Sequence, residues 1–144
     1  MKIVRDILDK KGAEVWTIEP SATVREALTE MAAKNVGALV VTDHKRVVGV
    51  ISERDYARKV IVKGKSSLDT RVAEIMATDP ICVTPGLTIG ECMSRMTDKR
   101  VRHLPVLDED DTLAGLVSIG DVVAGVLSEC ESKVDELQSF VYGT

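Results

Sequence analysis

Aromatic side chains are scarce in this sequence of 144 residues, which contains one Trp, two Tyr and one Phe. Hydrophobic residues nevertheless make up 44% of the chain, which is enough to build a core. That core must therefore be aliphatic. The length suffices for one compact unit or for two small ones.

The chain also lacks a net positive charge and long apolar segments. The formal net charge of −4 and the pI near 5.2 argue against a general nucleic-acid-binding surface. The longest apolar stretches, such as 47–51, have the length of a strand, far short of the roughly 20 residues that span a bilayer. Residues 1–6 lack the apolar core of a signal peptide. We therefore expect a cytoplasmic protein with no membrane insertion and no nucleic-acid partner.

Cysteine is rare, and its spacing argues against a metal site. Cys82, Cys92 and Cys130 are odd in number and form no CxxC or Cys/His ligand pattern. Cys92 occupies a position of a predicted helix that should face the core. We expect buried, reduced thiols and no bound metal.

What the sequence does contain is an internal repeat with a separation of about 65 residues. The recurring residues are Pro20, Thr23, Glu26, Met31, Lys34, Val36, Leu39, Val41 and Asp43, matched by Pro85, Thr88, Glu91, Met96, Lys99, Val101, Leu104, Val106 and Asp108. After a one-residue insertion, Gly49, Ser52 and Asp55 recur as Gly115, Ser118 and Asp121. Such a duplication predicts twin units that bury their apolar faces against each other and form paired clefts between them.

Each copy predicts strand, helix, strand, strand, helix, which is an α+β fold. The apolar runs place these strands at 15–18, 38–41 and 47–51, and at 81–83, 104–107 and 113–117. The first helices begin after Thr23 and Thr88, each followed three residues later by Glu, as in a capping box. The second helices begin after Ser52 and Ser118.

A short helical lead-in precedes each copy, with 4–8 echoed by 72–76. We assign each lead-in to the copy that follows it and treat the polar stretch 63–67 as the linker. The predicted domains are therefore 1–68 and 69–144. The second domain ends in a run with helical spacing, which we expect to cap the module or to pack on a second subunit; its apolar residues are Val134, Leu137, Phe140 and Val141.

The serine at the start of each predicted second helix is followed three residues later by Asp: Ser52 by Asp55, and Ser118 by Asp121. Capping alone explains such a pair. Both first helices use Glu at this place, however, and the shorter reach of Asp favours a second partner. A serine hydroxyl and the free N–H groups of a helix start can bind phosphate, and the Asp can accept both hydroxyls of a ribose. Capping and binding are compatible.

Basic residues lie close to these turns in the sequence. Arg102 could grip phosphate as a fork, and His103 could donate or accept a hydrogen bond beside it. A second cluster stands at a helix start, where the dipole favours acids, and consists of Arg54, Arg58 and Lys59. In a chain of net negative charge, both placements favour an anionic ligand.

The two copies differ at this point, because Gly37 and Ala38 stand where the second copy has Arg102 and His103. The small residues leave room for a flat base, so adenine could be held by aliphatic side chains and strand backbone without aromatic stacking. Pro105 lies near a strand start, where a missing N–H is tolerated. The difference predicts two unequal clefts.

Taken together, these segments resemble a tandem pair of cystathionine-β-synthase (CBS) domains, also called a Bateman module. The resemblance rests on 36–41 with 49–55, and on 101–106 with 115–121, and it covers essentially the whole chain. It implies two β-α-β-β-α repeats packed about a pseudo-twofold axis, their sheets face to face, with two clefts between them.

The resemblance also implies ligands and a role. Such domain pairs commonly bind AMP, ADP, ATP, NAD(H) or S-adenosylmethionine, often form dimers, and usually regulate an enzyme or a transporter. In the family the Asp of the turn holds the ribose and the Ser contacts phosphate. The candidate nucleotide-binding residues are therefore Thr17, Gly37, Ala38, Leu39, Ser52, Arg54, Asp55, Arg58, Ile81, Val101, Arg102, His103, Leu104, Pro105, Ser118, Ile119, Gly120 and Asp121.

We therefore predict a homodimeric, regulatory adenine-nucleotide sensor with no catalytic cofactor. The alternative is a ligand-free interaction and dimerisation module in which the Ser/Asp turns only cap helices. An enzyme is disfavoured because the sequence carries no nucleophile elbow and no Ser/His/Asp constellation. Residues 64–66 resemble the end of a Walker A loop, but Lys59 stands where its first glycine should be.

Overall fold

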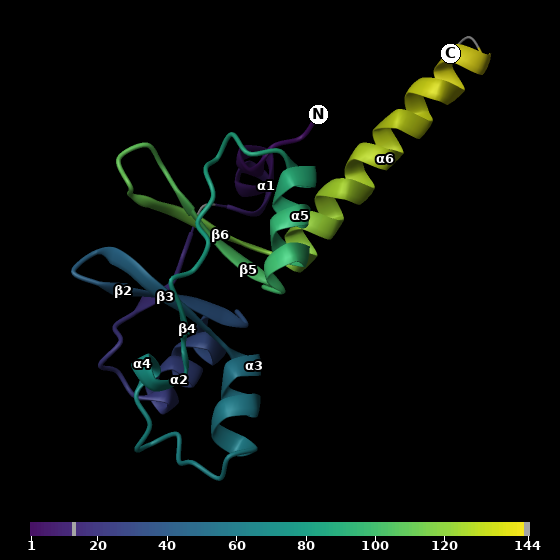
Figure 1. The fold of residues 1–144 in the computed structure, drawn as a ribbon. Coiled ribbons are helices and arrows are strands. Elements are labelled where there is room, and N and C mark those ends of the chain that lie inside the picture. Colours follow the sequence, from purple (N-terminus) through teal and green to yellow (C-terminus); the bar gives the residue numbers. More distant parts are fainter. Residues whose placement is uncertain (13, 143–144) are drawn as a thin grey trace.

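The computed structural model describes residues 1–12 and 14–142, which form two sheets with helices on their outer sides (Figure 1). The first sheet has the order β1-β2-β3-β4 and the second pairs β5 with β6. The strands are β1 (Thr17–Ile18), β2 (Ala38–Asp43), β3 (Arg46–Ser52), β4 (Ala77–Thr78), β5 (His103–Leu107) and β6 (Leu113–Ser118). The α+β class and the duplicated plan predicted from the sequence are confirmed.

The first helix of each repeat begins where the threonine caps predict. The Oγ1 atoms of Thr23 and Thr88 each accept a hydrogen bond at 3.1 Å, from the backbone N–H groups of Glu26 and Glu91. The helices are α2 (Val24–Lys34) and α5 (Ile89–Lys99), and both end at a left-handed residue. Each predicted capping box is thus formed in one of its two hydrogen bonds, the one that the threonine hydroxyl accepts.

Antiparallel hairpins follow, and they determine where the site forms. In β2–β3, Ala38 pairs with Ser52, and in β5–β6, His103 pairs with Ser118. The first residue of one strand therefore lies beside the serine that begins the next helix. The predicted strand at 81–83 is wrong: only Val83 forms an isolated bridge, to Val106.

The second helices differ between the repeats. The first repeat has α3 (Glu53–Tyr56), which continues as the π-helical turn η1 (Ala57–Ile61). The second has a single 24-residue helix, α6 (Ile119–Tyr142), which runs through the whole predicted C-terminal extension. The apolar residues of that extension are exposed, so it does not cap the module within this chain.

The two lead-in helices pack on the opposite repeats. Helix α1 (Val4–Lys11) belongs to the core of the second repeat, where the Val4 N–H donates to the Leu87 carbonyl at 2.8 Å. Helix α4 (Val72–Ile75) belongs to the core of the first repeat, and the Val72 N–H donates to the Ala22 carbonyl at 2.8 Å. The domains 1–68 and 69–144 therefore stay a prediction about the order along the sequence, whereas in space each lead-in completes the core of the opposite repeat. Periodicity reveals an apolar face but not which of two similar partners covers it.

Two aliphatic cores result, one per repeat, as the scarcity of aromatic residues predicts. Cys92 is buried, Cys82 is half-buried and Cys130 is exposed, and all three are free thiols. The expectation of three buried thiols is thus wrong for Cys130. Within the described residues, no helix is both long enough and apolar enough to cross a membrane.

Candidate functional site

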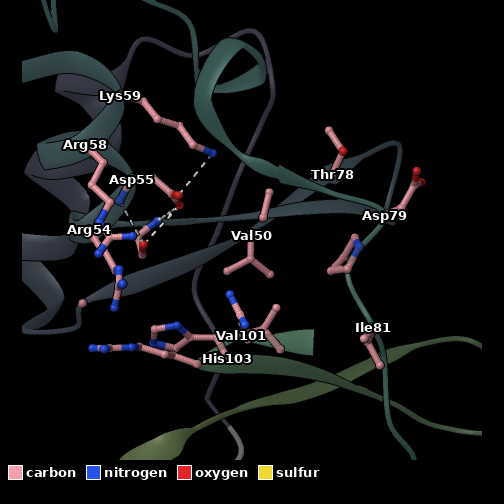
Figure 2. A pocket seen from close by; sticks show the side chains of 16 residues that line it. Val50, Arg54, Asp55, Arg58, Lys59, Thr78, Asp79, Ile81, Val101 and His103 are labelled. Atoms are coloured by element: carbon pink, nitrogen blue, oxygen red, sulfur yellow. Dashed lines mark hydrogen bonds and ion pairs between the residues drawn. The ribbon is translucent and has the colours of Figure 1, made fainter. Parts of the chain in front are cut away.

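The first cleft is a cavity of about 460 Å³ between the two repeats (Figure 2). One wall comes from the end of β3, the strand β4 beside it and the start of α3, and the other comes from 100–103 of the second repeat. The candidate residues gathered here are Gly37, Ser52, Arg54, Asp55, Arg58, Ile81, Val101, Arg102 and His103. The Ser/Asp turn of the first repeat therefore faces the basic strand start of the second, because the sheets approach each other across this space.

Capping hydrogen bonds orient Asp55 at the edge of the first cleft. Its Oδ2 accepts from the Ser52 N–H at 2.9 Å and from the Ser52 hydroxyl at 3.1 Å, and the Asp55 N–H donates to Ser52 Oγ at 3.2 Å. Its Oδ1 lies 3.4 Å from Lys59 Nζ, which also donates to the Ile75 carbonyl at 2.8 Å. The cap is thus formed, and Oδ1 keeps lone pairs available for a hydroxyl group.

Positive charge dominates the polar part of the first cleft. Five cationic side chains line it: Arg54, Arg58, Lys59, Arg100 and Arg102. The pKa of Arg54 is lowered by partial desolvation and by the charges of Arg102 and Arg58, with Asp55 acting in the opposite direction. Like charges held this close favour an anion between them.

The remaining wall is aliphatic and contains parts that sequence reasoning missed. The short strand β4 pairs with β3, Gly49 against Thr78 and Val50 against Ala77, which brings 77–80 into the cleft. Val50 and Ile81 then stand across from Val101 (Figure 2). No clear signal predicted a two-residue strand. Lys59 stood in the basic cluster with Arg54 and Arg58, and Arg100 lies two residues before Arg102, so both could have been included in the site.

The second cleft has a volume of about 320 Å³ and takes its Ser/Asp turn from the second repeat. Its lining includes Ser118 together with Gly37 and Ala38 of the first repeat. Trp16 also lines it, and Lys34 Nζ lies 4.3 Å from the centroid of the Trp16 ring. The sequence argument for a base held without aromatic contacts overlooked this tryptophan.

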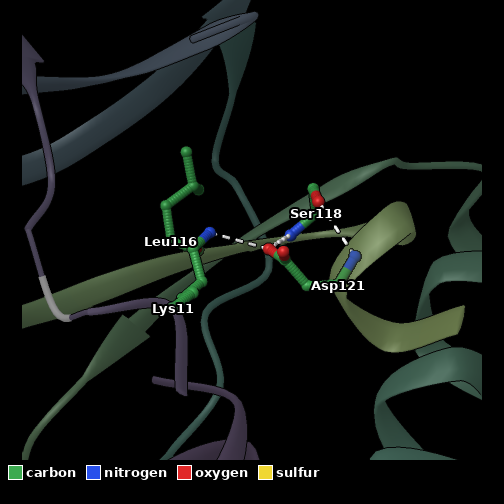
Figure 3. Close-up of polar contacts among 4 residues, drawn as sticks. All are labelled: Lys11, Leu116, Ser118 and Asp121. Carbon is green, nitrogen blue, oxygen red and sulfur yellow. Dashed lines mark hydrogen bonds and ion pairs between the residues drawn. The ribbon is translucent and has the colours of Figure 1, made fainter. Parts of the chain in front are cut away.

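A lysine from the N-terminal helix pairs with the acid of the second turn (Figure 3). Asp121 Oδ2 accepts from the Ser118 N–H at 2.8 Å, and Lys11 Nζ lies 2.7 Å from the same oxygen. Lys11 also donates to the Leu116 carbonyl at 2.9 Å. Burial acts to raise the pKa of Asp121, but the hydrogen bonds from Lys11 and Ser118 and the Lys11 charge outweigh it, so this pKa is lowered.

The two lead-in segments account for this asymmetry. Aligning 4–8 with 72–76 places Lys11 opposite Asp79, which lines the first cleft. An acid thus stands in the first cleft where a base stands in the second. The sequence predicted unequal clefts because Gly37 and Ala38 stand where the second copy has Arg102 and His103. The Lys11–Asp121 pair adds a second difference between the clefts.

His103 lies between the clefts and lines both of them. Burial lowers its pKa, and the nearby Lys11 lowers it further, while Asp121 and Asp55 act against this. His103 is therefore neutral at pH 7 in the structure and can donate one hydrogen bond and accept another.

Asp121 lines a neighbouring cavity and borders the second cleft through its contacts with Lys11 and Ser118, which line that cleft. The remaining candidate residues line neither cleft: Thr17, Leu39, Leu104, Pro105, Ile119 and Gly120. Leu39 and Leu104 are fully buried in the cores. Thr17 is exposed on the edge strand β1, where it pairs with Val40, and the Pro105 carbonyl accepts from the Val83 N–H at 2.9 Å. These residues support the fold around the clefts.

Comparison with known proteins gives matches over nearly the whole chain. The CBS domain family matches twice, at residues 4–62 and 72–128. The CBS domain-containing protein CBSX3, mitochondrial, of Arabidopsis thaliana is 39% identical over 97% of this chain and 72% of its own length. A signal-transduction protein with CBS domains from Burkholderia ambifaria has a solved structure with 43% identity and a TM-score of 0.83, covering 88% of this chain and 95% of that one. A CBS domain protein of Pyrobaculum aerophilum, solved in complex with AMP, is 29% identical with a TM-score of 0.74 and covers 83% and 89% of the two chains.

Proposed function

Because the chain belongs to the CBS domain family and carries two copies of the domain in tandem, we propose that it is a regulatory module that binds an adenine nucleotide in its first cleft. One observation carries this proposal: a carboxylate, five cationic side chains and an aliphatic slot share one cavity of about 460 Å³. The AMP bound to the relative from Pyrobaculum aerophilum supports the same ligand class.

Each part of a nucleotide has a counterpart in the first cleft. In the proposed pose, Asp55 accepts hydrogen bonds from the ribose hydroxyls, and the cations around Arg54 and Arg102 hold the phosphate. The adenine lies between Val50, Ile81 and Val101, where aliphatic contacts and strand backbone hold it. The Ser52–Asp55 cap supports this pose because it fixes the direction of the carboxylate before the ligand arrives.

Charge favours some adenosine ligands over others. Five cations stand against Asp55 and Asp79 in the lining, so anionic nucleotides such as AMP, ADP, ATP or NAD(H) gain Coulomb energy on binding. S-adenosylmethionine carries a sulfonium cation, which these same cations repel, so its binding loses Coulomb energy. We propose that the first cleft selects anionic nucleotides against the sulfonium ligand.

The second cleft is proposed to bind more weakly. Asp121, at the border of this cleft, already accepts hydrogen bonds from Lys11 and Ser118, so a ribose must displace the lysine before it can use the carboxylate. Displacement separates two opposite charges and leaves the Leu116 carbonyl without its donor. One ligand per chain is therefore expected at moderate concentration.

We propose a regulatory output rather than catalysis. A ligand that bridges the two repeats shifts their packing if it binds one arrangement better than another, and a partner enzyme or transporter can respond to that shift. Helix α1 and helix α6 are the proposed contact surfaces, since α1 reaches the second cleft through Lys11. Within the described residues, no group of three or more His, Cys, Asp and Glu is placed to hold a metal ion.

A homodimer and a cytoplasmic location complete the proposal. The three free thiols fit a reducing compartment. A pairing of two chains is supported by the exposed apolar side chains of α6.

A second candidate function is a ligand-free interaction module, because the formed Ser52–Asp55 cap accounts for the Ser/Asp turn without any ligand. Isothermal titration with AMP, ADP, ATP, NADH and S-adenosylmethionine separates the two functions. We expect heat with the anionic nucleotides and none with the sulfonium ligand. In Asp55→Ala we expect the heat to disappear, together with a loss of about 1 kcal/mol of stability from the cap.

Asp121→Ala serves as the matched control, because it removes the corresponding cap and leaves the first cleft intact. The sensor proposal fails if millimolar concentrations of every nucleotide give no heat, or if both alanine variants bind as the wild type does. In either case the interaction module is the better description.

A further inference from the structure

The C-terminal half of α6 extends away from the body of the protein (Figure 1). Every residue from 130 to 141 is exposed, including the large apolar side chains in this stretch. A helical segment of about 12 residues is marginal in water by itself, because isolated helices of that length gain too little from their own hydrogen bonds. We therefore expect this half of the helix to be stabilised by packing its apolar surface against a partner.

The exposed apolar residues of α6 follow a heptad pattern. We define the seam as Val123, Leu127, Cys130, Val134, Leu137 and Val141. Successive members are separated by four and three residues in alternation, so each position recurs after seven. A helix that faces the core of its own domain follows the 3.6-residue period of a straight helix, whereas a strict seven-residue repeat is typical of a left-handed coiled coil.

The exposure of the seam agrees with its pattern. Leu127, Leu137 and Val141 keep 58%, 64% and 68% of their surface accessible. Phe140 flanks the seam and is 87% exposed. The seam runs about 27 Å along the helix, at 1.5 Å per residue, from the edge of the body to the last turn. No charged residue interrupts it.

The residue types at the two heptad positions indicate the partner. Leu127, Val134 and Val141 occupy position a, and Val123, Cys130 and Leu137 occupy position d. In the exposed part of the seam, valine at a (Val134 and Val141) with leucine at d (Leu137) favours two parallel strands. We propose that the seam packs against the same seam of a second copy of this chain, as a parallel two-stranded coiled coil. The proposal is independent of nucleotide binding.

The charges beside the seam favour the parallel direction. In register, Lys133 at position g of one copy faces Gln138 at position e of the other, and no like charges meet. An antiparallel pair with the same overlap is centred near residue 132. In that arrangement the Glu131 side chains of the two copies would meet on one side of the seam, and their Lys133 side chains would meet on the other. Both like-charge contacts cost Coulomb energy.

The oligomeric state of the full chain tests the proposal. In analytical ultracentrifugation at micromolar concentration, we expect a dimer for the wild type and a monomer for Val134→Lys/Leu137→Lys. The matched control, Ser132→Lys/Ser139→Lys, adds the same charge at two f positions away from the seam and should remain dimeric. These residues are exposed, so circular dichroism should show all three proteins folded.

Cys130 reports the direction of the two helices. In the parallel, in-register arrangement the two Cys130 thiols face each other at position d, so mild oxidation should yield a covalent dimer that Cys130→Ser does not form. A dimer that survives the seam substitutions, a monomeric wild type, or a seam-dependent dimer without the Cys130 cross-link would each overturn the proposal. In those cases the chains pair through another surface, the seam binds another protein, or the helices run antiparallel.

Discussion

Lys11 Nζ lies 2.7 Å from Asp121 Oδ2, and these two residues are brought together from opposite ends of the chain. The lysine comes from the end of α1 and the acid from the first turn of α6. The contact exists only because α1 packs on the second repeat. It gives the second cleft an internal cation where the first cleft has the acid Asp79.

Removing that cation should increase the number of bound nucleotides. In Lys11→Met, we expect the stoichiometry of AMP binding by isothermal titration to rise from about one per chain to about two, because Asp121 becomes free to accept ribose hydroxyls. Lys10→Met removes the same charge from the exposed neighbour and serves as the control. An unchanged stoichiometry in Lys11→Met would show that Lys11 does not limit the second cleft.

The same pair predicts a pH dependence of stability. The folded-state pKa of Asp121 is lowered, so the pair stabilises the protein above the ordinary Asp range, about pH 4, and this contribution is lost as the pH falls through the folded pKa. The difference in free energy of unfolding between wild type and Lys11→Met should therefore shrink between pH 6 and pH 3. Urea unfolding followed by circular dichroism measures it. The difference should be modest because both side chains are partly exposed, and a difference independent of pH would contradict the prediction.

His103 should titrate below the usual histidine range. Burial and the charge of Lys11 lower its pKa, so unfolding takes up a proton and the stability from this residue falls as the pH drops below about 6.5. The sequence has two histidines, and His44→Gln leaves His103 as the single imidazole signal in an NMR titration. A midpoint at or above 6.5 would contradict the burial of His103. Under the proposed function, AMP raises the midpoint because its phosphate favours the imidazolium.

The packing of α4 on the first repeat predicts an intolerant glycine. A Cβ at Gly49 would lie 2.6 Å from Met76 Sδ and 2.8 Å from the Ala77 carbonyl oxygen. Gly49→Ala should therefore cost about 1–3 kcal/mol in urea unfolding, by forcing the Met76 segment away from β3.

Gly90→Ala is the control for this substitution. Gly90 lies in α5, and its Cβ would meet no heavy atom within 4 Å. This change should stabilise the protein by roughly 0.5–1 kcal/mol, since alanine loses less conformational entropy in a helix. Equal effects of the two substitutions would contradict the close contact at Gly49.

Local signals predicted much of this fold from the sequence. Thr23 and Thr88 begin their helices as expected, and Ser52 and Ser118 begin theirs, because a cap depends on residues three positions apart. The hairpins also follow from apolar runs with a polar turn between them.

Contacts between distant segments could not be predicted in the same way. Nothing near Lys11 in the sequence indicates that it meets Asp121, since that contact depends on which repeat α1 covers. The two-residue strand β4 is likewise fixed by its pairing with β3 rather than by its own residues. Of the candidate site residues, those at the strand and helix starts reach the first cleft, whereas Leu39 and Leu104 point into the cores because alternate strand residues face opposite sides.

The crossed packing of the lead-in helices makes this chain a covalent version of a domain-swapped dimer. A single repeat with its own lead-in could complete its core only by lending that helix to another copy and borrowing one in return. In the tandem chain both exchanges happen within one molecule, so neither depends on protein concentration. Cutting the chain at the linker should therefore give two fragments that fold together rather than two independent domains.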